Sequence, residues 1–366
     1  MALRIATFNV ENLFTRPAAM AANAGQAGQD AIEEHAELNG LILKDVFSAA
    51  DKARLLALDQ KYQFSALNPP SNALVFFNKI RGQLFSRSQA GVVTVVANGR
   101  ADFTGWFELR VTDVSWPAIF NTGRVIAETS ADIQVCVEVE NRPTLLRFND
   151  QVLGVKFNKA YPHVMLIDGN DDRGIDVGIL SRFPIVAMTS HVDDRNLNGE
   201  RTFSRDCPEY LIELPGGQQI VILPNHFKSK RGGNTPAMVA RRKAQADRAH
   251  DIALAALNAT EFVLVAGDLN DTPNSPAFPK LFQDGFVDVQ DHPTYPTDRP
   301  GTFETGTAAN KIDYLIMSPG LRGVLTNTGL ERRGSFHPNT FPHFDTVTGS
   351  DDEASDHHLV FADFSL

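Results

Sequence analysis

The sequence predicts a mixed α/β protein in which polar side chains follow buried strands. Apolar residues recur at three- and four-residue spacing within 26–62, which is typical of helices, and 237–257 is an alanine-rich stretch that predicts a long helix. The apolar run 262–266 leads through Gly267 into Asp268 and Asn270, which is typical of a buried strand that ends in carboxylate and amide groups. We expect the glycine to let the backbone turn where the strand ends. This stretch is either a polar turn or a site held on a rigid strand.

Composition narrows the class of protein. The chain has 366 residues, of which 43% are hydrophobic and 21% charged, as in ordinary globular proteins. The formal charge of −10 argues against a surface that grips nucleic acid everywhere, but it allows a locally basic site. Cys136 and Cys207 lack the spacing of a zinc site, and Cys136, inside an apolar run, is expected to be a buried thiol, although a single disulfide stays open. Without a long apolar run or a signal sequence, we expect a cytoplasmic protein with no membrane segment.

The first third of the chain combines one strand with a long elaboration. A strand over 3–10 ends beside Asn9 and Glu11. A helical pattern then covers 26–62, and short β-rich runs follow between 73 and 114. We therefore interpret 15–120 as a helical and β-hairpin elaboration inserted after the first strand.

The rest of the chain alternates strands with helices. The strand over 131–143 carries Glu138 and Glu140, and a period of two puts both on one side, with Val137 and Val139 on the other. Further strands are expected at 163–168, 174–185, 210–214, 219–227, 311–318 and 357–364. Helices are expected at 144–153, 237–257 and, briefly, 278–282.

Six strand ends carry polar groups that suit one kind of site. They are Asn9 with Glu11, Glu138, Asn225 with His226, Asp268 with Asn270, Asp313, and Asp356 with His357. If these ends meet at one edge, acids, amides and two histidines converge. Hard divalent cations take such oxygen ligands, so we expect one or two Mg²⁺ or Mn²⁺ ions, with Ca²⁺ also possible. The sequence has no HExxH motif, and a zinc protease site therefore lacks support.

Six motifs occur in the order TFNVENL, VEVEN, NHFKSK, GDLND, NKIDYL and SDHH. In this order the chain resembles the endonuclease/exonuclease/phosphatase superfamily, which has the deoxyribonuclease-I-like fold, over residues 1–14 and 131–366. The resemblance implies a four-layered α/β sandwich of two packed, mostly antiparallel β-sheets flanked by helices. It makes 1–366 a single domain of this family, with 15–120 as a large, family-atypical helical and β insertion after the first strand.

The resemblance also implies residue roles. Metal ligands would be Asn9, Glu11, Glu138 and Asp356. Catalytic residues would be His226, Asp268, Asn270, Asp313 and His357. Substrate contacts would come from Asn225, Arg173, Lys228 and Lys230. The chain departs from many relatives in having Val137 where they have Gln, and Arg173 and Asp176 are the nearest candidates for a partner of the second histidine.

A basic cluster follows the NHFKSK motif directly. It comprises Lys228, Lys230, Arg231, Arg241, Arg242, Lys243 and Arg248, against the single acid Asp247. The cluster is either a solvated helix face or a set of contacts to a phosphate backbone.

The expected function is a divalent-metal-dependent phosphodiester hydrolase, in the first place a nuclease that cuts DNA or RNA by in-line attack of water. Thr272 and Pro273 after GDLND resemble the nuclease-like branches of the superfamily. One alternative keeps the chemistry and changes the substrate, as a phosphomonoesterase or a phospholipase C-like enzyme. An alternative of another class is a catalytically silent binding module.

Overall fold

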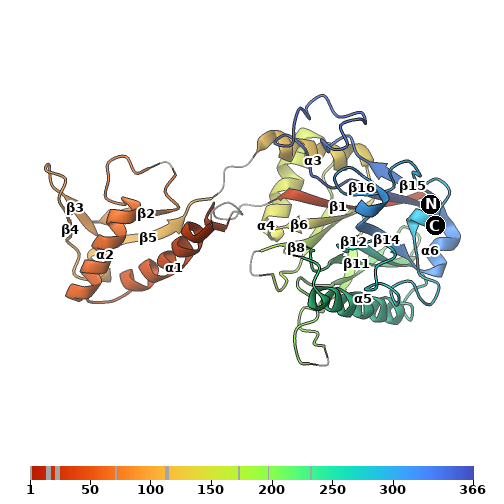
Figure 1. Ribbon diagram of the computed structural model, residues 1–366, viewed down its shortest axis with the longest axis horizontal. Helices are drawn as coiled ribbons and strands as arrows, with labels where there is room; N and C mark the ends of the chain where they lie inside the picture. Colours follow the sequence, from red (N-terminus) through yellow and green to blue (C-terminus); the bar gives the residue numbers. More distant parts are fainter. Residues whose placement is uncertain are drawn as a thin grey trace. The chain divides into compact units, whose positions relative to one another are not determined.

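The computed structural model describes residues 2–13, 18–20, 25–70, 72–111, 115–171, 174–196, 198–230 and 233–366. The chain divides into two compact units, which are described separately (Figure 1). The larger unit comprises Met1–Phe14 and Val114–Leu366, and the smaller unit comprises Thr15–Asp113. The insertion expected at 15–120 therefore extends past the smaller unit, into a helix of the larger one.

Two six-stranded sheets form the larger unit. The first has the order β15 (Leu325–Glu331), β16 (Leu359–Ser365), β1 (Ala2–Leu13), β6 (Ile133–Val139), β8 (Asp176–Ser181) and β7 (His163–Leu166). The second has the order β13 (Val287–Asp288), β14 (Asp313–Met317), β12 (Val263–Asp268), β11 (Gln219–His226), β10 (Glu209–Glu213) and β9 (Ile185–Thr189). Pairing is parallel between β1 and β6 and between β11 and β12, and antiparallel elsewhere in both sheets.

The sheets pack face to face, and helices cover their outer faces (Figure 1). The core between the sheets includes Ile5 and Val135 from the first sheet and Ile222, Leu264 and Leu315 from the second. Helices α3 (Trp116–Thr129) and α4 (Arg142–Arg147), with the π-helix η3 (Phe148–Lys156), pack on the first sheet. Helix α5 (Pro236–Ala256) packs on the second, and the short α6 (Pro319–Val324) follows β14. The expected four-layered α/β sandwich is confirmed.

Strand alternation decides which side chains reach the space between the sheets. In β12, Val263 and Val265 pack towards α5, whereas Leu264 and Ala266 face the other sheet. Asp268 therefore continues the face that points towards the first sheet. The same alternation in β14 and β11 puts Asp313 and His226 on this face.

Some expected elements differ in the structure. The short helix expected at 278–282 is wrong: the segment forms successive turns, and Pro279 lacks the N–H that a continuing helix needs. The helix expected at 144–153 is real but is made of α4 and η3. Strands β9, β13 and β15 and helix α3 were not predicted from the sequence.

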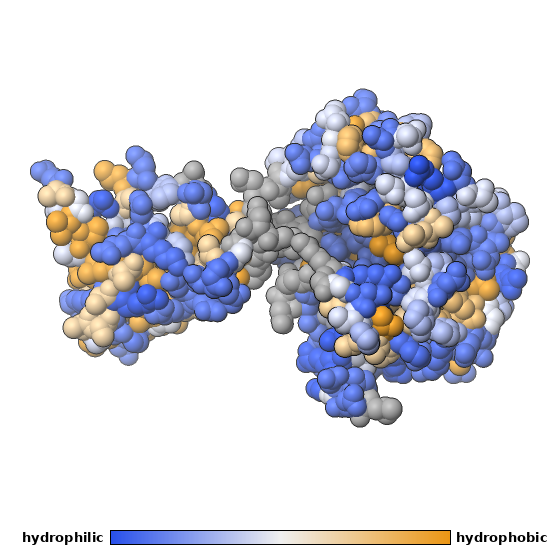
Figure 2. Space-filling view, viewed as in Figure 1, coloured by the Kyte–Doolittle hydropathy of each residue, from blue (hydrophilic) through white to orange (hydrophobic). Residues whose placement is uncertain are grey.

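The smaller unit has its own core. It contains η1 (Ala18–Met20), α1 (Gly25–Ile42), α2 (Ala49–Tyr62), the pair β2 (Val75–Gly82) and β5 (Phe103–Leu109), the pair β3 (Phe85–Arg87) and β4 (Val93–Val95), and η2 (Arg100–Asp102). Leu38, Leu55 and Phe107 are buried in that core. Hydrophobic residues are also exposed on this unit (Figure 2). The large exposed side chains include Ile80 and Trp106.

Both cysteines are buried free thiols, which confirms the expectation for Cys136. Among the described residues, no helix combines the length and the apolar character needed to span a bilayer.

Candidate active site

Asp268, at the end of β12, is the centre of the polar cluster. Four side-chain nitrogens surround its Oδ2 atom: Asn270 Nδ2 at 3.1 Å, Asn9 Nδ2 at 3.3 Å, His226 Nε2 at 3.6 Å and His357 Nε2 at 4.0 Å. The side chain is 3% exposed. Burial, followed by repulsion from Asp313, raises the pKa of Asp268 to about 7. A carboxylate with such a pKa is suited to accept a proton near neutral pH.

Local backbone geometry presents this carboxylate. Gly267 has φ +139°, and a Cβ atom there would lie 1.9 Å from the carbonyl oxygen of Asn225 on the neighbouring strand. The glycine is thus required by a close approach inside β12, not by a turn at the end of the strand as expected. Beyond the strand, the Asn270 N–H donates to Asp268 Oδ1 at 2.8 Å and holds the carboxylate from its other side.

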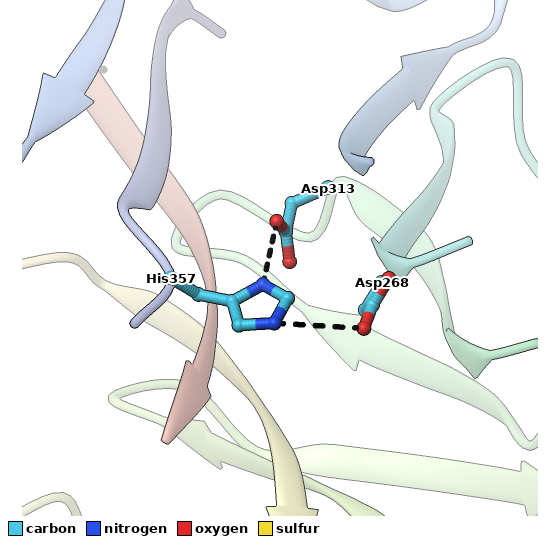
Figure 3. Close-up of side chains that lie close together, drawn as sticks. All are labelled: Asp268, Asp313 and His357. Atoms are coloured by element: carbon cyan, nitrogen blue, oxygen red, sulfur yellow. Dashed lines mark hydrogen bonds and ion pairs between the residues drawn. The ribbon is translucent and has the colours of Figure 1, made fainter. Parts of the chain in front are cut away.

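His357 and Asp313 form a buried pair next to Asp268 (Figure 3). His357 Nδ1 lies 2.9 Å from Asp313 Oδ2, so the carboxylate partner assigns the proton to Nδ1. Burial alone would lower the pKa of His357, but the carboxylates of Asp313, Asp268 and Asp356 raise it well above its usual value. These carboxylates therefore favour the protonated ring beside Asp268.

Acidic side chains from three strand ends gather on another side of the cluster. The Asp356 N–H donates to Glu11 Oε2 at 3.3 Å, and Glu138 Oε1 lies 3.8 Å from His226 Nε2. Burial, then repulsion between the two carboxylates, raises the pKa of Glu11, and burial also raises that of Asp356. In the described part of the chain, none of these three acids pairs with lysine or arginine. Hard oxygen donors that lysine and arginine leave unneutralised suit Mg²⁺ or Mn²⁺.

A β-bulge brings Glu138 to this place. The register between β6 and β8 shifts between Val137 and Val139, and Glu138 has φ +66°. Val137 packs between the sheets whereas Val139 packs towards the helices, so the expectation that they share a side is wrong. The extra residue breaks the period of two and lets Glu138 approach His226 of the other sheet.

A second irregularity places Glu11. The β1–β6 register shifts between Asn9 and Leu13, and Glu11 has φ +46°. The Glu11 N–H lies 3.3 Å from Asn9 Oδ1, which accepts it. Both amide and carboxylate thereby stay at the cluster.

The structure brings together nine of the thirteen residues assigned from the sequence: Asn9, Glu11, Glu138, His226, Asp268, Asn270, Asp313, Asp356 and His357. Asn225 is not among them. Its side chain is buried, lies at the Cys207 thiol and donates to the Leu223 carbonyl 3.1 Å away, on the face opposite to His226. The expected substrate contact at Asn225 conflicts with strand alternation. Arg173 lies outside the described residues.

Most of the basic cluster engages acids of the chain itself. The ion pairs are Lys230–Asp271 at 2.5 Å, Arg242–Asp271 at 3.0 Å, Lys243–Asp247 at 2.5 Å and Arg248–Asp194 at 2.7 Å. Arg242 is fully buried and also donates to the Lys228 carbonyl, which ties the loop after β11 to the GDLND segment. Lys228 donates to the Ser229 carbonyl at 3.3 Å. The cluster is therefore largely a structural network.

Thr302 contacts the site and was not predicted from the sequence, whereas Asp176 was named as a candidate. The Thr302 hydroxyl lies 2.6 Å from Asp313 Oδ2, but a lone threonine in a loop carries no recognisable pattern. Asp176 lies opposite Val139 and accepts the Gly169 N–H at 2.9 Å. Burial raises its pKa to about 7. Its role as a partner of the second histidine stays a prediction.

The four-layered sandwich, with acids, amides and histidines at the strand ends, defines a class of metal-dependent phosphoesterases with the deoxyribonuclease-I-like fold. The sequence matches the model of the Endonuclease/Exonuclease/phosphatase family over residues 80–357. The chain belongs to this family, whose enzymes generally use divalent metal ions. No curated protein matches the chain.

Solved structures share the fold at low sequence identity. A mannosyl-6-phosphatase from Bacteroides thetaiotaomicron is 15% identical with a TM-score of 0.51, over 69% of this chain and 92% of that one. A family protein from the same organism is 16% identical with a TM-score of 0.50, over 69% and 91%. Sphingomyelinase C from Streptomyces griseocarneus is 18% identical with a TM-score of 0.47, over 68% and 93%.

Proposed function

We propose that the protein hydrolyses phosphodiester bonds with a divalent metal ion, and that nucleic acid is its substrate. The observation that carries the proposal is the arrangement around Asp268, a buried carboxylate flanked by a charged histidine and two amides. Cleavage of a phosphodiester needs a water activated on one side and charge stabilised on the phosphoryl oxygens. The cluster offers both kinds of group within 4.0 Å of one atom.

The acidic end of the cluster is the place for the metal. Glu11, Glu138 and Asp356, with the amide of Asn9, would hold Mg²⁺ or Mn²⁺. When bound, such an ion polarises a phosphoryl oxygen and neutralises developing negative charge. The raised pKa values of Glu11 and Asp356 fit a site in which a bound cation would offset the repulsion between the carboxylates.

The remaining side chains would act on the water and the phosphate. Asp268 accepts the proton of the attacking water, and Asn270 holds the Asp268 carboxylate in position. His357, oriented by Asp313, donates from Nε2 to a phosphoryl oxygen. His226 lies between Glu138 and Asp268 and would hold both carboxylates in position.

A small phosphoester is the second candidate substrate, and one observation favours it. Four cations of the basic cluster are engaged in ion pairs inside the chain, which leaves fewer of them to follow a polyanionic backbone. The mannosyl-6-phosphatase of the same fold makes a sugar phosphate a reasonable probe.

The test compares substrates and variants under one set of conditions. With Mg²⁺ or Mn²⁺, we expect cleavage of plasmid DNA, single-stranded DNA or RNA, and a loss of about 100-fold or more in Glu138→Gln and His357→Ala. Glu213→Gln, at an exposed acid at the end of strand β10, is the matched control and should retain activity. Cleavage of only sugar phosphates, inositol phosphates or sphingomyelin would refute the nuclease assignment, and full activity in Glu138→Gln would refute the site.

A further inference from the structure

We propose that Thr302 is a positioning residue that fixes the Asp313 carboxylate and, through it, the ring of His357. The inference rests on the proposed function, in which His357 acts on the phosphoryl group. Thr302 itself touches neither Asp268 nor the acidic end of the cluster in any hydrogen bond of the described residues.

The hydrogen bonds that Thr302 accepts fix the direction in which its hydroxyl proton points. Oγ1 accepts the N–H of Ile312 at 3.1 Å and the N–H of Asp313 at 2.9 Å. A hydroxyl has two acceptor positions and one proton. Because both acceptor positions face main-chain donors, the proton points to Asp313 Oδ2, 2.6 Å away. Thr302 is fully buried, so water does not compete for this bond.

The threonine is itself held from two sides. Its N–H donates to the Asn310 carbonyl at 2.9 Å, and its carbonyl accepts the N–H of His358 at 2.6 Å. These bonds tie the Thr302 loop both to the segment before β14 and to the segment that carries His357. Besides the direct bond between Asp313 and His357, one connection between their two segments therefore passes through Thr302.

The orientation of the Asp313 carboxylate depends on this hydroxyl because only one of its two oxygens receives hydrogen bonds among the described residues. Oδ2 receives both the Thr302 hydroxyl and His357 Nδ1–H, whereas Oδ1 is buried and has no hydrogen-bond partner among the described residues. Lys311 Nζ bonds the Asp313 carbonyl and holds the main chain. Loss of the hydroxyl would thus let the Asp313 side chain rotate while its main chain stays in place. A rotated carboxylate would release the His357 ring, whose Nε2 now faces Asp268.

The kinetic test uses Thr302→Val, which keeps the shape and removes the proton, and Thr302→Ser, which restores it. Thr328→Val is the matched control, because Thr328 is also buried and donates to a main-chain carbonyl, that of Phe361 at 2.7 Å, away from the site. We expect kcat on the best phosphodiester substrate to fall about 100-fold in Thr302→Val with KM unchanged. Thr302→Ser should recover most of kcat, and Thr328→Val should match the wild type.

Equal kcat in Thr302→Val and Thr328→Val would overturn the proposal, and so would a change confined to KM. If Thr302→Val does not fold, Thr302→Cys replaces it, since a thiol is a weak donor. Its kcat should then lie between those of the wild type and His357→Ala, and a wild-type kcat would overturn the proposal.

An NMR measurement separates this proposal from the proposed function. The Nδ1–H proton of His357, assigned by its absence in His357→Gln, should resonate at low field because it bonds Asp313. We expect Thr302→Val to shift or broaden this resonance and Thr328→Val to leave it unchanged. An unchanged resonance in Thr302→Val refutes the positioning role even if the protein is an active nuclease. A changed resonance in a protein without phosphodiesterase activity supports the hydrogen-bond chain and refutes only the proposed function.

Discussion

Replacing Gly267 by alanine should destabilise the larger unit by more than any ordinary glycine substitution in a turn. The new Cβ atom would lie 1.9 Å from the Asn225 carbonyl oxygen and 2.9 Å from its carbonyl carbon. These atoms belong to the backbone of β11, which is paired with β12 in the middle of the second sheet. Neither strand can move aside without breaking its own ladder of hydrogen bonds.

Two terms set the magnitude for Gly267→Ala. An L-residue held at a φ of +139° costs about 1–3 kcal/mol in backbone strain. Forcing an extra carbon into a packed interior costs about 1–3 kcal/mol more, and occasionally exceeds that. We expect a loss of about 4 kcal/mol in the free energy of unfolding.

The matched control is Gly216→Ala in the turn between β10 and β11. Gly216 also has a positive φ, +99°, but a Cβ atom there would meet nothing within 4 Å. The difference between the two variants therefore isolates the collision with Asn225. Urea unfolding is best followed in a Trp106→Phe background, where Trp116 of α3 is the remaining tryptophan and reports on the larger unit. With an unchanged slope, the midpoint of Gly267→Ala should fall by on the order of 1 M. Equal midpoints for the two variants would refute the close approach.

Three further changes test other parts of the larger unit. Burial lowers the pKa of His358 to about 4, so the stabilising contribution of the neutral ring is present above about pH 6.5 and is lost as the pH falls towards 4. The free energy of unfolding should drop by about 3 kcal/mol over this window. The drop should be smaller in His358→Asn. Lys311→Met leaves the buried Asp288 without the ammonium 2.8 Å away and should cost about 3–5 kcal/mol by urea unfolding, most of which the double variant with Asp288→Asn should recover. Because Glu138 has φ +66°, Glu138→Gly should be more stable than Glu138→Ala by about 1 kcal/mol, and the reverse order in melting temperature would show that the bulge relaxes.

The periodicity of apolar residues along the strands was enough to predict most of the fold and the position of some site residues. In β12 and β14 the alternation of apolar residues runs unbroken to the polar residue, so the side of Asp268 and of Asp313 follows from the sequence. The same rule correctly applied to β11 sends Asn225 to the opposite side from His226. The assignment of Asn225 to the site came from a motif and not from this alternation, which is why the structure places its side chain apart from the cluster.

The bulge at Glu138 could not be predicted from its own strand. An irregularity of register exists only between two strands, and β6 reads as a regular alternation up to Val139. The signal that distinguishes the bulge is the left-handed backbone of Glu138, which depends on pairing with β8 and β1. Sequence patterns therefore identified the residue but not the direction of its side chain.

The ion pairs of the basic cluster could not be predicted from the sequence either. Along the chain, its cations have one acidic neighbour and look available for phosphate groups. In the fold, Asp271 and Asp194 reach Arg242 and Arg248 from positions 29 and 54 residues away. Pairs of that separation depend on how α5 lies on the second sheet. Local charge counts therefore overstate how much positive charge is left for a substrate.

Backbone conformation offers an independent argument that the cluster serves chemistry. Among the described residues with positive φ that are not glycine, Gln63 and Ser130 end helices, as left-handed caps commonly do. Glu11, Glu138 and Asn270 instead all lie at the cluster, where glycine would relieve strain of about 1–3 kcal/mol each. Side chains of the cluster hold two of these backbones, since oxygens of Asn9 and Asp268 accept their N–H groups. Asn158, Asp284, Arg299 and Glu304 also have positive φ, so this backbone conformation is not confined to the cluster. At the cluster, glycine would relieve the strain but would remove the carboxylates and the amide.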